Sequence, residues 1–326
     1  MVAALLLAST TAYVLVARKA QLDAAASAPE QPTTSAEAIG SGPRIMFRNT
    51  AIGPDYGRVA MVPLDAPGGS RAFVDLSCDR ITATRLNTLC LASDLGVVTT
   101  FTAKVYPAAG KAPVQLPLSG SPSRARLSKD GWFAATTSFV AGDSYAQAGF
   151  STRTVVTALA ERSSHDLESF RLVHEGKHIS PTDRNYWGVS FAADDDSFFV
   201  TVAFGEATYL AKGRMSTRTI DTIRTDAECP SLSPDESRVA YKKRGDRAPG
   251  DWRIAVLDLT TGKETILAEK RSVDDQVEWL DDDRIIYGLP GAGADAAQSN
   301  VWVTNADGTG SPEILLERAW SPAVIR

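Results

Sequence analysis

The residue types of a catalytic metal site occur in one short motif, His174-Glu175-Gly176-Lys177-His178. In zinc proteases this H-E-x-x-H spacing places two histidines one helical turn apart, with the glutamate as general base. Gly176 weakens a helix by about 1 kcal/mol, and the flanking residues 171–173 and 179–181 are typical of strand and loop. We therefore expect a hairpin or a connection between sheets here, in which the two histidines point in unrelated directions.

Three runs of carboxylates, at residues 194–196, 274–275 and 281–283, are the candidates for binding calcium. None belongs to the D-x-[DN]-x-[DN]-G loop with a distal glutamate that calcium prefers, and two of them occupy a recurring turn described below. The G-x-S-x-G elbow of serine hydrolases does not occur in the sequence. These patterns predict no metal site, no cofactor and no catalytic residues.

Cys78 and Cys90 are the pair of cysteines that could form a disulfide. The residues between them are typical of two strands around a turn near residues 84–87, and antiparallel pairing would bring both ends together. A disulfide requires Cα atoms within about 7 Å and an oxidising compartment. We favour the bridge if the chain is exported, with two buried thiols as the alternative, and we expect Cys229 to be a small buried residue.

The elements that must position these residues are short strands. From residue 43 onward, runs of Val, Ile, Thr, Phe and Tyr are punctuated by Gly, Asp, Pro and Ser. Four segments align with one another, each with a strand, an acidic turn and a second apolar strand: residues 124–139, 187–204, 229–243 and 276–288. The middle aspartate of the turn recurs at positions 130, 195, 235 and 282, where its side chain suits tight-turn geometry. A third strand, a hairpin and a fourth strand follow, so each repeat has the size of a propeller blade.

Six such blades fit the chain, at about residues 44–75, 76–119, 120–172, 182–225, 226–270 and 272–317. The first blade lacks its innermost strand, whereas residues 320–325 (WSPAVI) are typical of an inner strand without a blade. We therefore predict an all-β, six-bladed propeller over residues 43–326. Its C-terminal strand, residues 320–325, is expected to pair with residues 44–49 and close the ring, which removes the exposed sheet edges of an open array.

The repeats resemble the WD40-like repeat of the TolB-type β-propeller family. That pattern is Pro-x-x-Ser-Pro-Asp-Gly followed by an apolar strand ending in Ala-Tyr, and residues 230–241 (PSLSPDESRVAY) match it except that Glu236 replaces the glycine. Residues 305–310 (NADGTG) resemble the family's turn between third and fourth strands. The resemblance implies the fold and, because family members are usually exported, an extracytoplasmic location. It implies no specific function, because such propellers serve many roles.

The N-terminal residues 2–17 (VAALLLASTTAYVLVA) are uncharged and apolar or small. As a helix they would span about 24 Å, short of the ~30 Å hydrocarbon core but within tolerable mismatch. We expect a signal anchor or transmembrane helix over residues 1–19 and a flexible linker over residues 20–42, which are rich in Ala, Ser, Thr and Pro.

The orientation of this anchor is left open by the charges around it. Arg18 and Lys19 follow the apolar run, and the positive-inside rule would place the large domain in the cytoplasm. The family resemblance favours the opposite side. Ala26-Ser27-Ala28 resembles a cleavage site, although Pro29 disfavours cleavage, so we favour an anchored over a secreted protein.

The long loops between second and third strands would share one face of the propeller, at residues 49–57, 141–147, 245–251 and 290–299. Exposed aromatic residues together with arginine are common in protein interfaces. The binding-face candidates, beside these loops or near inner strands at the channel mouth, are Tyr56, Tyr145, Tyr186, Trp187, Arg247, Trp252 and Trp320. Each aromatic taken alone is more often part of the packing within a blade.

The chain has 326 residues, 44% of them hydrophobic and 22% charged, with a formal net charge of −5. This composition is that of a globular protein, and the mild negative charge provides no basic surface for nucleic acid. We expect a monomeric, non-catalytic protein-binding or scaffold propeller on the extracytoplasmic side of the membrane, which recognises an unidentified protein or envelope component. The alternative is a propeller enzyme, a hydrolase or lyase acting on a cell-surface glycan or lactone.

Overall fold

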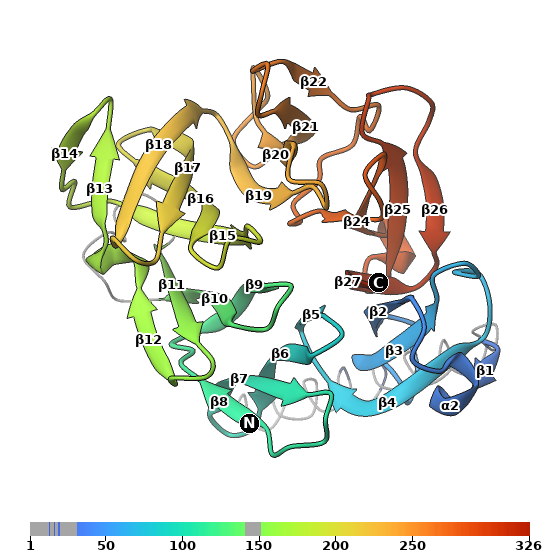
Figure 1. The fold of residues 1–326 in the computed structure, drawn as a ribbon. Coiled ribbons are helices and arrows are strands. Elements are labelled where there is room, and N and C mark those ends of the chain that lie inside the picture. The colour runs from blue at the N-terminus through green and yellow to red at the C-terminus, as the bar shows by residue number, and fades with distance from the viewer. Residues whose placement is uncertain (1–12, 14–15, 17–18, 20–30, 141–150) are drawn as a thin grey trace, which may run out of the picture.

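The computed structural model describes residues 13, 16, 19, 31–140 and 151–326. Figure 1 shows six sheets arranged as blades around a central axis. From the axis outward, the strands of blade one are β27 (Ala319–Ile325), β2 (Arg44–Asn49), β3 (Arg58–Pro63), β4 (Arg71–Ser77) and β1 (Thr33–Thr34). Those of blade two are β5 (Arg80–Ala83), β6 (Asn87–Leu95), β7 (Thr99–Pro107) and β8 (Val114–Leu116). Those of blade three are β9 (Ser121–Leu127), β10 (Phe133–Val140), β11 (Ser151–Ala158) and β12 (Ser163–Asp166).

The remaining half of the ring follows the same order. Blade four consists of β15 (Asn185–Phe191), β16 (Ser197–Phe204), β17 (Ala207–Arg214), β18 (Thr219–Thr225), β13 (Arg171–His174) and β14 (Lys177–Ile179). Blade five consists of β19 (Glu228–Leu232), β20 (Arg238–Lys243), β21 (Arg253–Asp258) and β22 (Glu264–Ile266). Blade six consists of β23 (Glu278–Trp279), β24 (Arg284–Pro290), β25 (Ser299–Asn305) and β26 (Glu313–Leu316). The predicted all-β, six-bladed architecture is confirmed.

The ring is closed by the C-terminal strand. β27 lies innermost in blade one and pairs antiparallel with β2, with Ile325 opposite Arg44 and Val324 opposite Ile45. Figure 1 shows the C-terminal strand beside β2, next to the axis. The predicted closure is confirmed, and the two ends of the propeller share one sheet.

The outer edges of two blades differ from the expectation. The repeat pattern predicts residues 171–172 in blade three, but β13 pairs in parallel with β18 of blade four, and β14 extends that sheet. The H-E-x-x-H motif therefore forms a hairpin in which His174 lies opposite Lys177. His174 Nδ1 lies 2.9 Å from Thr222 Oγ1, and His178 Nδ1 lies 3.1 Å from the Leu172 carbonyl oxygen. The two histidines therefore have separate partners.

Part of the expected linker, residues 20–42, is folded onto blade one. β1 pairs in parallel with β4, and Ala36 and Ile39 of the short helix α2 (Ala36–Ile39) pack against the core between blades one and two. Residues 20–30 lie outside the described residues, as does almost all of the expected anchor over residues 1–19. Among the residues that the structure does describe, no helix has the length and apolar character that crossing a bilayer requires.

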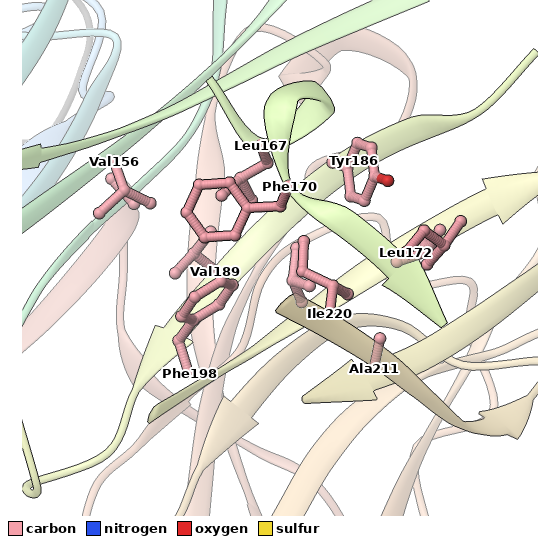
Figure 2. Packing of buried hydrophobic residues seen from close by; sticks show 12 residues of the cluster. Val156, Leu167, Phe170, Leu172, Tyr186, Val189, Phe198, Ala211 and Ile220 are labelled. Atoms are coloured by element: carbon pink, nitrogen blue, oxygen red, sulfur yellow. The ribbon is translucent and has the colours of Figure 1, made fainter. Parts of the chain in front are cut away.

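The hydrophobic core is divided into layers between neighbouring blades. One layer joins Ala135 and Val156 of blade three to Val189, Phe198 and other residues of blade four. Figure 2 shows this layer, with apolar side chains from strands of both blades in one cluster. Because side chains alternate between the two faces of a strand, each blade contributes to the layers on both of its sides. This packing holds the inner strands in fixed positions around the axis.

The acidic turns of the repeat are stabilised by their own side chains. In blade five, Ser233 Oγ donates to Asp235 Oδ1 at 2.5 Å, and the Ser237 amide donates to the same oxygen at 3.1 Å. Glu236, which replaces the glycine of the TolB-type pattern, has φ +60, the left-handed conformation that glycine adopts without strain. The departure from the pattern therefore keeps the turn geometry.

The propeller has two faces because successive strands of a blade run in opposite directions. We call the face that carries the turns between first and second strands the turn face, at residues 84–86, 128–132, 192–196, 233–237 and 280–283. The opposite loop face carries the described connections between second and third strands, at residues 50–57, 96–98, 205–206, 244–252 and 291–298. The connections between blades also lie on the loop face.

Candidate functional site

Charged side chains gather on the inner strands, which line the central channel. Arg80 lies on β5, Arg124 and Arg126 alternate along β9, and Glu278 lies on β23. Side chains two residues apart share one face of a strand, which explains why both arginines of β9 reach the axis. The channel is therefore polar along its length, in contrast to the apolar layers between the blades.

Three consecutive residues, Asp274, Asp275 and Gln276, cross this channel. We call them the crossbar. They belong to the connection between β22 and β23, residues 267–277, which is much longer than the connections at residues 78–79, 226–227 and 317–318. The crossbar replaces the first part of the inner strand of blade six, so that β23 has only two residues.

The crossbar binds side chains and backbone of five blades. Asp274 accepts from Arg124 at 3.0 Å and from Lys242 at 2.8 Å. Asp275 accepts from Arg80 at 2.8 Å and from the Gly288 amide at 3.0 Å. These contacts join blades two, three, five and six across the channel.

The deepest residue of the crossbar completes this set. Gln276 Nε2 donates to the carbonyl oxygens of Val189 and Pro230, both at 2.9 Å, and so reaches blades four and five. Below it, Arg126 forms an ion pair with Glu278. The channel is thus filled by successive ion pairs and hydrogen bonds, from the loop face toward the turn face.

The electrostatics keep Asp274 ionised. Its side chain is 63% exposed toward solvent, while the protein surrounds its other sides. Desolvation by burial would raise the pKa of Asp274, but the charges of Lys242 and Arg124 outweigh it, so the pKa is lowered from its ordinary value. A carboxylate with a lowered pKa accepts hydrogen bonds and does not serve as a proton donor at neutral pH.

Two hollows remain in the channel. One of about 20 Å³ lies between Arg80, Arg124 and Asp275. The other, of about 100 Å³, lies toward the turn face, where Arg126, Lys129 and residues from all six blades surround it. Both are small, so a ligand larger than a few atoms reaches the charged side chains only if the crossbar moves.

The structure separates the aromatic candidates at the channel. Tyr186 is 1% exposed and packs in the layer between blades three and four, so it belongs to the core and not to the channel mouth. Figure 2 shows it among the apolar side chains of that layer. Burial raises its pKa to about 12. Trp187, on the same strand, is 7% exposed and offers little surface to a partner.

Two tryptophans do lie beside the crossbar. Lys242 Nζ lies 3.9 Å from the ring centroid of Trp252, whose Nε1 donates to Glu228 Oε1 at 2.9 Å. The Arg80 guanidinium lies 4.8 Å from the ring of Trp320. Each tryptophan therefore supports one of the cations that bind the crossbar, through a cation–π contact.

The remaining candidates lie on the loops. Tyr56 is 43% exposed, and its hydroxyl donates to the Ala297 carbonyl oxygen at 3.1 Å. Arg247 donates to Asp251 at 2.5 Å and to the Lys270 carbonyl oxygen at 2.8 Å. Tyr145 lies outside the described residues. Cys78 and Cys90 form a disulfide, with their Cα atoms 5.4 Å apart, and Cys229 is a buried free cysteine.

The sequence-based candidates do not include the charged residues of the channel. Arg124 and Arg126 carry the signal that could have identified them, because a charged residue at every second position of an inner strand points to the axis.

The sequence-based candidates also omit an exposed apolar group on the loop face. The tip of the β6–β7 hairpin, formed by Leu95, Val97 and Val98, is 81%, 108% and 74% exposed. We call these three residues the apolar tip.

Comparison with known proteins identifies the fold. No protein-family model matches the chain, and no curated protein matches it in sequence. The structure of TolB from Acinetobacter baumannii is similar with a TM-score of 0.62 and 15% identity, over 87% of this chain and 67% of that one. A nidogen/laminin complex contains a similar chain, with a TM-score of 0.56 and 11% identity, over 87% of this chain and 98% of that one. An oligogalacturonate lyase in complex with manganese is less similar, with a TM-score of 0.49 and 9% identity, over 76% of this chain and 72% of that one.

Proposed function

From the six-bladed propeller fold that it shares with TolB, we propose that this chain is a non-catalytic protein-binding module whose partner docks on the loop face. The observation that carries the proposal is the apolar tip. Three adjacent aliphatic side chains at the end of a hairpin are almost fully exposed to water. Apolar groups that project in this way from a soluble domain are typical of protein interaction sites.

The surroundings of the apolar tip support an interface of useful size. Tyr56 of blade one and Phe139 of blade three are each 43% exposed, and both lie on the loop face of the blades beside blade two. β6 and β7 have nine residues each, more than the other strands of the propeller that the structure describes, so the tip projects from this face. A face that exposes both aliphatic and aromatic side chains has the composition of an interface core.

The carboxylate at the mouth of the channel is unsuited to the role of a glycosidase proton donor. A glycosidase needs a carboxyl group with a raised pKa as its proton donor, whereas the pKa of Asp274 is lowered by Lys242 and Arg124 against the effect of burial. The nidogen/laminin complex provides an example of a chain with this fold in a complex between proteins.

We also propose that the propeller lies on the extracytoplasmic side of the membrane, anchored by the apolar N-terminal residues. The Cys78–Cys90 disulfide supports this location, because disulfides persist in oxidising compartments and are rare in the cytosol. A thiol reagent that cannot cross the cytoplasmic membrane tests it. We expect the reagent to label a cysteine placed at exposed Ser216 in intact cells, and protection of that cysteine until the cells are lysed would contradict the proposal.

The binding proposal is tested by replacing Leu95, Val97 and Val98 with threonine, which retains the preference for strand. A photocrosslinking residue placed at Thr99 would be used in intact cells to capture the partner. We expect the amount of crosslinked partner to fall at least about tenfold in the triple variant, because the apolar contacts of the tip are lost. A tenfold loss of affinity corresponds to about 1.4 kcal/mol of binding free energy.

A matched control replaces exposed aliphatic residues on the outer strands, Ile223, Ile266 and Ile314, with threonine. These residues are 48%, 40% and 44% exposed and lie on the fourth strands of blades four, five and six, none of which adjoins blade two. The control should capture the same partner as the unmodified protein. Equal capture by the variant of the apolar tip would exclude the tip as the docking site.

A further inference from the structure

We propose that the mouth of the channel on the loop face is a binding site for an acidic peptide segment, and that the crossbar occupies this site in the free protein. The partner supplies two consecutive carboxylates that replace Asp274 and Asp275 on Arg80, Arg124 and Lys242. This site is separate from the apolar tip, so the inference holds whether or not the tip binds a partner.

The connection that carries the crossbar is longer than the ring requires. Three of the connections between blades consist of two residues, at 78–79, 226–227 and 317–318. The connection between β22 and β23 runs over residues 267–277 and shortens the inner strand of blade six to Glu278–Trp279. The additional residues bring a segment with two carboxylates to the axis, where it binds the cations of other blades.

The Asp274 carboxylate lies outside the two cations that it binds, so a carboxylate of a partner can replace it from the solvent side. The side chains of Lys242 and Arg124 are 3% and 9% exposed, whereas that of Asp274 is 63% exposed. The carboxylate is therefore the outer layer, and the two cations lie beneath it. A carboxylate arriving from solvent meets Asp274 first and takes its place on the two cations. The Asp275 side chain is only 3% exposed, so the second carboxylate of the partner reaches Arg80 after the crossbar has moved.

The cations are held in position from their other side. Trp252 lies against Lys242, and Trp320 lies against Arg80. The Trp252 ring is fixed in turn by its hydrogen bond to Glu228. These three contacts do not involve Asp274, Asp275 or Gln276, so they persist when the crossbar leaves. The Trp252 amide also donates to Ser272 Oγ, just before the crossbar, at 3.1 Å.

The rest of the site selects a peptide over a simple anion. The carbonyl oxygens of Val189 and Pro230 both accept from the side-chain amide of Gln276. A free carboxylate has no donor for these two acceptors, and buried acceptors without donors are costly. In a segment with two acidic residues followed by asparagine or glutamine, the carboxylates bind the cations and the side-chain amide donates to the two carbonyl oxygens.

The experiment uses a fluorescent synthetic peptide with the sequence of residues 272–277 (SVDDQV) and a second peptide with both aspartates replaced by asparagine. Asp274→Asn removes the outer carboxylate and leaves Arg124 and Lys242 without its charge. We expect this variant to bind the acidic peptide at least about tenfold more tightly than the unmodified protein, and the asparagine peptide to bind neither. The binding should weaken with added salt.

The control variant is Asp221→Asn, which removes the same charge from an exposed position on β18, the fourth strand of blade four. It should bind the acidic peptide no better than the unmodified protein. Equal affinities of Asp274→Asn and Asp221→Asn for the acidic peptide, or equal binding of both peptides, would overturn the proposal.

A measurement on the unmodified protein does not depend on the folding of a variant. Amide hydrogen exchange of residues 267–277 would be followed with and without an excess of the acidic peptide. We expect exchange in this segment to become faster when the peptide displaces the crossbar, with the strands of blade three unchanged. Unchanged or slower exchange at saturating peptide would show that the crossbar is not displaced.

Discussion

At the scale of single residues, the acidic turns show how one aspartate responds to a neighbouring blade. Asp130 and Asp195 occupy the same position in the turns of blades three and four. The neighbouring Asp130 carboxyl group, through hydrogen bonding, and then some desolvation and the charge of Asp130, raise the pKa of Asp195 to about 6. Between about pH 4 and pH 6, the Asp195 carboxyl group is therefore protonated in the folded protein and ionised in the unfolded chain.

We predict that Asp195→Asn stabilises the protein at neutral pH. A raised pKa in the folded state means that the contribution of the pair is fully present below about pH 4 and is lost as the pH rises through 6. The asparagine amide donates to Asp130 at every pH, and asparagine tolerates the left-handed φ of +55 at this position. Thermal unfolding should show a Tm about 1–2 °C higher than that of the unmodified protein at pH 7.5.

The difference in Tm between the two proteins should disappear toward pH 4. Asp221→Asn serves as the control for the change in net charge, since Asp221 lies on an exposed strand position and is not among the groups that shift the pKa of Asp195. A stabilisation that is the same at pH 7.5 and pH 4 would contradict the shared proton.

At the scale of elements, β24 and β27 approach each other closely beside the crossbar. Gly288 of β24 has no side chain, and the Trp320 ring of β27 occupies the space where one would lie. A Cβ atom at this position would lie 2.4 Å from Trp320 Cε3 and 3.1 Å from Asp275 Oδ2. The glycine therefore allows the tryptophan and the crossbar to reach the channel together.

We predict that Gly288→Ala destabilises the protein by about 1–3 kcal/mol, the usual effect of overpacking a filled site. Urea denaturation followed by fluorescence measures this difference. Gly68→Ala is the matched control, because Gly68 lies in open space without a left-handed φ, and we expect a change within about 0.5 kcal/mol. Similar stabilities of the two variants would show that Trp320 can move aside without cost.

At the scale of the whole molecule, the closure of the ring determines how the protein unfolds. β27 gives β2 its inner partner, and Ala323 and Ile325 are each 2% exposed in the core between blades one and two. β1 and α2 lie at the opposite, outer edge of the same blade. Removing the inner edge therefore disrupts the closure of the ring, whereas removing the outer edge affects only blade one and its packing.

We predict that deleting residues 319–326 lowers the Tm by more than about 10 °C and broadens the transition, because it opens the ring and exposes a sheet edge. A chain that begins at residue 43 in place of residue 31 lacks only β1 and α2, and its Tm should fall by less than half as much. Thermal unfolding of both truncated chains, followed by circular dichroism, makes the comparison. Equal losses would mean that closure adds nothing to stability beyond local packing.

The local features of the fold could be predicted from the sequence. The repeated acidic turn, with its aspartate at positions 130, 195, 235 and 282, depends on contacts within a few residues, such as that of Ser233 with Asp235. The hairpin at the H-E-x-x-H motif is also local, because Gly176 and its strand-forming neighbours disfavour a helix. The outer edges of the blades were less predictable, because β13 pairs with β18, more than 40 residues away.

The candidate site could be predicted only in part. The sequence places Trp252 beside a loop between second and third strands and Trp320 near an inner strand, and both lie beside the channel. It also places Tyr186 near an inner strand, but Tyr186 faces the layer between two blades. A sequence shows that a residue belongs to a strand, but which face of the strand meets the channel depends on register, and a shift of one residue exchanges the faces.

The amino-acid sequence by itself determined the number of blades, the acidic turns and the strand that closes the ring, because each of these follows from patterns within about 50 residues or from a missing strand at one end. Only the tertiary structure decided that Asp274, Asp275 and Gln276 meet five blades at the axis and that Leu95, Val97 and Val98 are left in solvent. Arg80 and Asp275 are 195 residues apart in the chain. Their contact exists because six sheets pack side by side and close a circle. A pattern within a short stretch of sequence cannot reveal a contact between residues so far apart in the chain.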